Sequence, residues 1–186
     1  MFLLSNHYRS PIDYSEDSMK EVSLGLDRVY AFLERLDQAG IKPDETQTGN
    51  LWEEFSDAMN DDFNSAKALA CVFDAVKKGN RLLDDAKGNV TESLSGELGR
   101  MLHDIRSVAG ILGIFLLSPA DYFSAKKQKG VSDQAIDPAF VDDLIRQRAE
   151  ARKTKNFKRA DEIRGQLQTM KIILEDGPGG TTWRFE

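Results

Sequence analysis

The sequence has very little of what disulfides and protein metal sites are made from. Its 186 residues include one cysteine, Cys71, and two histidines, His7 and His103. A single cysteine excludes an internal disulfide and a cysteine-based metal cluster, and it is typical of proteins from a reducing compartment. Two histidines are too few for a histidine-rich metal site. We therefore expect no metal-binding residue and no cofactor within this chain.

Long hydrophobic runs are also absent. The longest, from Val108 to Leu117, has ten residues, which is about half of what crosses a bilayer. The first residues are apolar, but they lack the basic and hydrophobic regions of a signal peptide. The net charge of −6 disfavours a surface that coats nucleic acid or an anionic membrane, although it leaves room for a local basic patch. We expect a cytoplasmic protein with no membrane and no DNA partner.

The usual sequence signatures of catalysis are missing as well. The chain has no P-loop, no dinucleotide-binding glycine motif, no nucleophile elbow and no zinc-protease motif. The adjacent acids Asp61 and Asp62 could take part in acid–base or metal chemistry. However, neighbouring residues on a helix face different ways, and paired acids at a helix start are usually surface groups. We therefore assign no catalytic residue.

What the sequence does contain is helical periodicity. Through the first two-thirds of the chain, apolar residues recur at steps of three and four, which places them on one face of each helix. Ser15 is a candidate N-cap for the first helix, and Asn50 with Glu53 resembles a capping box. We predict an up-and-down helical bundle over residues 1–118. The clearest apolar series are Met19, Val22, Leu26, Val29, Leu33 and Leu36, and Leu94, Leu98, Met101, Ile105, Val108 and Leu112.

A second, smaller unit is predicted after a linker at residues 119–135, which begins with Pro119 and contains three lysines and a glycine. Two helices follow, at about residues 136–153 and 156–170. A β-hairpin with a Gly-Pro-Gly-Gly turn ends the chain. The predicted fold is thus mainly α, with a small α+β domain of two helices and a C-terminal hairpin over residues 136–186.

Basic residues concentrate on the predicted helix pair. Residues 136–186 carry a net charge of +1 whereas the preceding part carries −7, and residues 144–164 hold eight basic side chains against three acidic ones. Arg152, Lys155 and Arg159 lie at spacings of three and four, so they can share one helix face that attracts phosphate. The alternative is a solvated helix flank with no ligand.

Aromatic and acidic residues are interleaved with these basic ones. Single-stranded RNA is recognised by stacking its bases on aromatic rings, while polar side chains hydrogen-bond the base edges. Phe157 can be such a ring or can pack against the hairpin, and Trp183 can likewise be a core residue. Asp161 can accept hydrogen bonds from guanine or cytosine. The composition suits an RNA-binding unit, and a packed core is the alternative for both rings.

Several stretches resemble the bacterial cysteinyl-tRNA synthetase family. Residues 4–15 resemble the start of its helical domain, and residues 58–69 resemble its M-D-D-D-F-N-T-P-x-A-L stretch. The motif A-R-x-x-K-D-[FW]-x-x-A-D-x-x-R stands almost unchanged at residues 151–164, and L-E-D-x-x-x-G-T-T-W at residues 174–183. The resemblance covers nearly the whole chain.

This resemblance implies a DALR-type bundle followed by a small anticodon-binding domain. In the family, an upstream Rossmann-type domain with His-Ile-Gly-His and Lys-Met-Ser-Lys-Ser signatures uses ATP and holds the zinc that selects cysteine. Neither signature occurs in this sequence. We therefore interpret the chain as a C-terminal fragment, inactive alone, whose partners are the catalytic domain and the anticodon loop of cysteine tRNA.

The resemblance also implies which residues contact the anticodon. Phe157, where some members have Trp, would stack on a base, and three polar residues would read base edges. Two further residues match the hairpin motif and would either touch RNA or brace the hairpin. The polar residues are Arg152, Asp161 and Asp176, and the hairpin residues are Trp183 and Arg184.

Two positions depart from the family pattern. Asn156 replaces the usual Asp, and Lys171 replaces the usual Gly before the first hairpin strand. If that Gly has a positive φ, a Lys in its place costs about 1 kcal/mol.

Two other functions stay open. One is the related mycothiol-pathway cysteine ligase, which is expected to lack the motif at residues 174–183. The other is a helical protein-interaction or structural bundle that no longer binds RNA.

Overall fold

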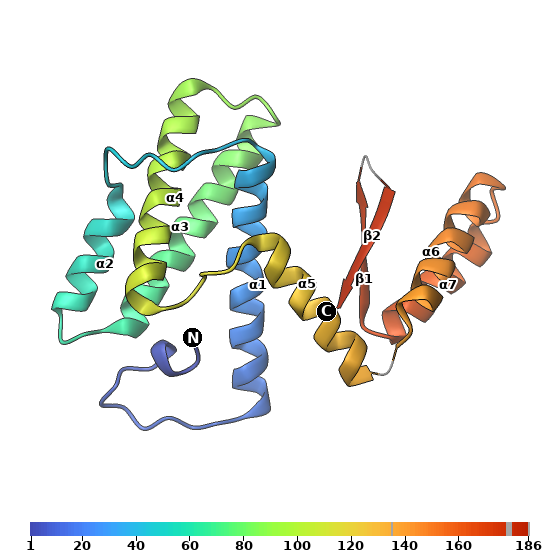
Figure 1. The fold of residues 1–186 in the computed structure, drawn as a ribbon, viewed down its shortest axis with the longest axis horizontal. Helices are drawn as coiled ribbons and strands as arrows, with labels where there is room; N and C mark the ends of the chain where they lie inside the picture. The colour runs from blue at the N-terminus through green and yellow to red at the C-terminus, as the bar shows by residue number, and fades with distance from the viewer. Residues whose placement is uncertain (135, 178–179, 186) are drawn as a thin grey trace. The chain divides into compact units, whose positions relative to one another are not determined.

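The computed structural model describes residues 1–134, 136–177 and 180–185, and it divides into two compact units, Met1–Pro119 and Ala120–Glu186. As predicted, the described chain is mainly α, with one antiparallel hairpin. The elements (Figure 1) are η1 (Leu3–Ser5), α1 (Glu16–Gln38), α2 (Asn50–Asn60), α3 (Ser65–Ala86), α4 (Glu92–Leu112), α5 (Pro119–Gln134), α6 (Pro138–Lys153), α7 (Phe157–Thr169), β1 (Ile172–Gly177) and β2 (Gly180–Phe185).

The first unit is a bundle of α1 to α4. Helix α3 contacts both α1 and α2, and α4 contacts α2 and α3. Most residues of the predicted apolar series line its interior, because one face of each helix is apolar and only facing stripes remove that surface from water. Met19, the first residue of the first series, is instead 40% exposed. Its fully buried side chains include Val29, Phe32, Leu36, Leu69, Val72, Leu98, Ile105 and Val108.

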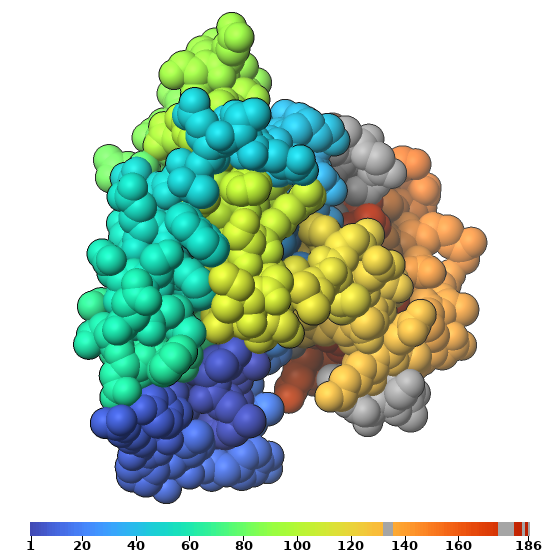
Figure 2. Space-filling model, turned by 60° about the vertical axis from the view of Figure 1, so that its left-hand side comes forward, coloured from blue at the N-terminus to red at the C-terminus, as the bar shows by residue number. Residues whose placement is uncertain are grey.

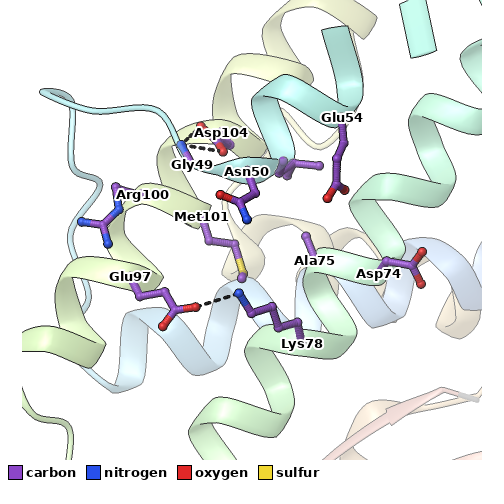
Figure 3. A pocket seen from close by; sticks show the side chains of 11 residues that line it. Gly49, Asn50, Glu54, Asp74, Ala75, Lys78, Glu97, Arg100, Met101 and Asp104 are labelled. Atoms are coloured by element: carbon purple, nitrogen blue, oxygen red, sulfur yellow. Dashed lines mark hydrogen bonds and ion pairs between the residues drawn. The ribbon is translucent and has the colours of Figure 1, made fainter. Parts of the chain in front are cut away.

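Two helices of the bundle begin differently from one another. Ser15 caps α1 as predicted, since its hydroxyl accepts the Ser18 N–H at 3.0 Å. The prediction that Asn50 caps α2 is wrong. The N-cap is Gly49, which has no side chain to accept a hydrogen bond. The carboxylate of Asp104 on α4 takes the place of the missing cap side chain. Asp104 accepts the N–H of Gly49 at 3.0 Å (Figure 3). It also accepts the N–H of Trp52 at 3.1 Å.

The loop before α2 packs closely on α4. Figure 2 shows this loop and α2 lying over α4. Asp44 donates its N–H to the Gly99 carbonyl at 3.0 Å, and a Cβ at Gly99 would lie 2.7 Å from the Lys42 carbonyl oxygen. The loop passes directly over position 99, so a side chain there would collide with it and glycine is required.

The segment expected as a linker, residues 119–135, differs in the structure, where Pro119–Gln134 forms α5. The ammonium of Lys127 lies 3.8 Å from the centre of the Trp183 ring. A Cβ at Gly130 would lie 2.2 Å from the Phe185 ring. The lysines and the glycine that resemble a linker thus belong to a helix that packs on the hairpin. Gly130 allows α5 to approach the Phe185 ring closely.

The rest of the second unit contains α6, α7 and the hairpin. Asp137 caps α6, with Pro138 at its first position, where a missing N–H costs nothing. The strands pair Leu174 with Trp183 and Ile172 with Phe185. One core joins these elements, and its buried members are Val141, Leu144, Ile163, Leu167, Ile172, Trp183 and Phe185.

Lys171 occupies the left-handed backbone region just before β1. Its φ is 55°, and its side chain is exposed. An L residue with a side chain is strained there, whereas glycine is not. We expect Lys171→Gly to raise the free energy of unfolding of the second unit by about 1 kcal/mol.

Urea unfolding can measure the effect of Lys171→Gly on the free energy of unfolding. In a Trp52→Phe background, the fluorescence of Trp183 reports on the second unit alone. Lys171→Ala is the matched control, because it removes the same side chain but keeps the Cβ. Equal stabilisation by both substitutions would show that the side chain, and not the backbone, carries the strain.

Candidate nucleic-acid interface

A tight corner joins α6 to α7. Thr154 donates its N–H to the Glu150 carbonyl at 3.0 Å, and Lys155 turns the chain with a φ of 58°. Asn156 then caps α7 by accepting the Arg159 N–H at 3.2 Å. Asp and Asn are about equally good N-caps. The departure from the family's Asp at this position therefore keeps the corner intact.

Three of the predicted site residues lie exposed on and beside this corner. Arg152 is in the last turn of α6, Phe157 is the first residue of α7, and Asp161 follows one turn later. Phe157 has 61% of its surface exposed. Of the two alternatives for this ring, the structure therefore shows a ring in solvent and not one packed against the hairpin.

One flank of α7 carries more than the ring and the acid. Phe157, Asp161, Arg164 and Gln168 follow at steps of four, three and four, so they share one side of the helix. A hollow of about 320 Å³ lies beside this flank, lined by Arg148, Arg164, Gln168 and residues 172–174 of β1. Rings, guanidinium groups and amides on one surface are the groups that bind unpaired nucleotides.

The expected basic face of Arg152, Lys155 and Arg159 does not form. The helix ends at Lys153, so the spacing of three and four does not continue through Lys155. Arg159 lies on α7 and donates to Gln147 at 3.2 Å and to Glu162 at 3.4 Å. Sequence spacing failed here because the break between the two helices, which the sequence itself predicts, falls between Arg152 and Arg159.

The turn end of the hairpin lies at the same end of the second unit as this corner. Helix α7 runs back from the corner and β1 returns, so the end of β1 points the same way as the corner but stands apart from it (Figure 1). Asp176 is in that end of β1, paired with Thr181. The side chains of Asp176 and Arg184 are outside what the structure describes, so only their strand positions are known.

Trp183, by contrast, lies in the core. It is 6% exposed, and its indole N–H donates to Asp142 at 2.7 Å. Its ring meets Phe185 edge to face, with ring centres 5.5 Å apart. A ring enclosed in this way cannot stack on a base. Of the two roles considered for Trp183, the packing favours bracing the hairpin.

The first unit has a hollow of its own, between α2, α3 and α4 (Figure 3). Its volume is about 290 Å³. Lys78 and Glu97 in its wall form an ion pair at 2.8 Å, and Asp104 is occupied with the start of α2. Its charges thus hold the helices together, and we assign no chemistry to it.

The acid pair that could have been catalytic has structural contacts. Asp62 accepts the Tyr8 hydroxyl at 2.8 Å and pairs with Arg9 at 3.2 Å, which ties the N-terminal segment to the turn between α2 and α3. The hydrogen bond to Asp62 raises the pKa of Tyr8. The sequence gives no sign of this link, because nothing in either stretch indicates the other.

The remaining chemistry-bearing side chains give no further site. Burial, and then the charges of Glu54 and Asp74, raise the pKa of Cys71, so its thiol stays protonated at neutral pH. Over the described residues, no three His, Cys, Asp or Glu side chains are grouped to hold a metal ion. In the same part of the chain, no helix combines the length and the apolar character that a membrane span needs.

Comparison with known proteins bears on both units. Residues 54–116 match the DALR domain model, and residues 138–184 match that of the cysteinyl-tRNA ligase anticodon binding domain. Proteins described as cysteine–tRNA ligases match the whole chain: 37% identical in Trichlorobacter lovleyi and 41% in Geobacter sp. strain M21. The chain belongs to the cysteine–tRNA ligase family. It spans 40% and 39% of the lengths of these two relatives.

The cysteine–tRNA ligase of Pseudomonas aeruginosa is 37% identical over 98% of this chain, and this chain spans 36% of the length of that relative. The match to the anticodon binding domain model, at residues 138–184, includes the corner, the exposed flank of α7 and most of the hairpin. The predicted resemblance to this family is therefore confirmed for both units.

Proposed function

We propose that this chain binds the anticodon loop of cysteine tRNA as part of a longer cysteine–tRNA ligase. The observation that carries the proposal is the 61% exposed ring of Phe157 at the start of α7, within a match to an anticodon-binding domain. A ring this exposed, at the same corner as Arg152 and one turn from Asp161, contributes little to packing the unit. Unpaired bases in a loop stack on such rings, so the corner is suited to an anticodon.

The polar side chains supply base recognition in this proposal. A carboxylate such as Asp161 accepts from N1 and N2 of guanine or N4 of cytosine, both of which occur in the GCA anticodon for cysteine. Arg152 donates from the other side of the corner, and Asp176 would add a second carboxylate from the end of β1. Trp183 positions the strands and does not touch RNA.

The catalytic consequence is positioning. Binding energy gained at the anticodon orients the distant acceptor end of the tRNA in the active site. In the proposed enzyme, which works in the cytoplasm, the sites for ATP, cysteine and zinc lie in the part of the relatives that this chain does not match. The chain alone therefore binds tRNA without attaching cysteine.

Asp161→Ala tests this function in a gel-shift titration with cysteine tRNA and with the same tRNA carrying a changed anticodon. We expect affinity for the first RNA to fall about tenfold and affinity for the second not to fall, because one good base contact is worth about 1–3 kcal/mol. Glu162→Ala is the matched control, since it removes a neighbouring exposed acid that pairs with Arg159.

Two results would count against the proposal. A wild-type chain that binds both RNAs equally would contradict anticodon recognition altogether. Equal effects of Asp161→Ala on the two RNAs would show that Asp161 contributes charge and does not read a base.

A further inference from the structure

The hollow beside α7 has the composition of an anion site. Its polar wall is made by Arg148 and Arg164 with Gln168, and its other wall is the apolar start of β1. Among the described residues that line it, none is acidic. A guanidinium group on a concave surface is suited to phosphate, because it can donate two parallel hydrogen bonds.

Arg164 differs from two other arginines of the helix pair, Arg146 and Arg159. Arg146 contacts Asp143, and Arg159 contacts Glu162 and Gln147. The hydrogen bond from Gln147, with that from Arg146, holds the pKa of Asp143 below its usual value. Within the described part of the chain, no carboxylate pairs with the exposed Arg164. Its charge is therefore available to a ligand.

The hollow lies along the path that leads away from the exposed ring. Arg164 is seven residues after Phe157 on the same side of α7, which places it about 10 Å further along the axis. A strand whose base stacks on Phe157 brings its neighbouring phosphates past this point. The apolar wall of β1 can at the same time face a ribose or base.

We propose that this hollow binds a backbone phosphate of the tRNA next to the anticodon, held by Arg164 with Arg148 and Gln168. The inference rests on the proposed function. It assigns these residues to sequence-independent anchoring, in contrast to Asp161, which reads bases. Phosphate contacts fix the register of the RNA but carry no sequence information.

The experiment compares Arg164→Gln with Arg146→Gln on the full chain, using cysteine tRNA and its anticodon variant over a series of salt concentrations. We expect Arg164→Gln to weaken binding to both RNAs by the same factor, about five- to tenfold, and to reduce the magnitude of the salt slope by about one. Gln168→Ala should weaken both RNAs by a smaller common factor, without the change in slope.

Arg146→Gln is the control because Arg146 is an exposed arginine outside the hollow, and we expect it to change little. A loss with Arg164→Gln no larger than this control would overturn the inference, as would a loss confined to the cysteine anticodon. These outcomes are distinct from failure of the proposed function. In that case the wild-type chain itself would not distinguish the two anticodons.

Discussion

Replacing Asp104 by alanine is expected to lower the free energy of unfolding of the first unit by about 3 kcal/mol. The carboxylate is fully buried and accepts the N–H groups of Gly49 and Trp52. Hydrogen bonds to a charged group are worth about 1.5–3 kcal/mol each, and removing the acceptor leaves donors at the start of α2 without a partner. Asp104 therefore ties α4 to the start of α2.

Hydrogen exchange measured by mass spectrometry can localise this effect. With Asp104→Ala, peptides from α2 and α4 should exchange roughly a hundredfold faster, since 1.4 kcal/mol corresponds to a factor of ten. Peptides from α6 and α7 serve as the internal control and should be unchanged, because the second unit has its own core.

Asp104→Asn is the conservative comparison, because it keeps one acceptor oxygen and most of the volume. We expect it to lose less than half as much. If alanine and asparagine variants were equally stable to within about 0.5 kcal/mol of the wild type, Asp104 would not be the residue that fixes the start of α2.

Replacing Phe157 by alanine is expected to weaken binding to cysteine tRNA by about tenfold to a hundredfold. Stacking on an aromatic side chain is worth about 1–3 kcal/mol per base. The ring is exposed and contributes little to the core, so the stability of the second unit should change by less than about 0.5 kcal/mol. Binding and folding are therefore separable at this position.

Phe157→Trp and Phe157→Leu provide the comparison for this result. Tryptophan keeps a stacking surface and should keep the affinity of the wild type. Leucine is apolar but has no ring, so it should lose nearly as much as alanine. Full affinity with leucine would show that the side chain acts as a hydrophobic contact and not as a stacking platform.

The sequence predicted the hairpin and the helices other than α5 because their patterns are local. Steps of three and four mark the apolar faces, and Ser15 marks the start of α1 without reference to the rest of the chain. Contacts between distant stretches were not predictable in this way. The cap of α2 comes from Asp104, more than fifty residues later, and Asp62 meets Tyr8 and Arg9 across a similar distance.

The candidate site shows the same limit. The resemblance placed Phe157 and Trp183 together in one set, but only packing separates an exposed ring from a buried one. Trp183 is covered by Lys127 of α5, a segment whose lysines and glycine resembled a linker. Spacing alone likewise joined Arg152 to Arg159, although the corner at Lys155 puts them on different helices.

The central claim is that the corner and its flank, and not the bundle, touch the anticodon. An NMR titration of the isotope-labelled chain with the isolated anticodon stem-loop of cysteine tRNA tests it most directly. We predict that amide shifts will change mainly within residues 148–168 and at the turn end of the hairpin, and far less with a stem-loop of altered anticodon. Shift changes confined to the bundle, or identical for both RNAs, would contradict the account.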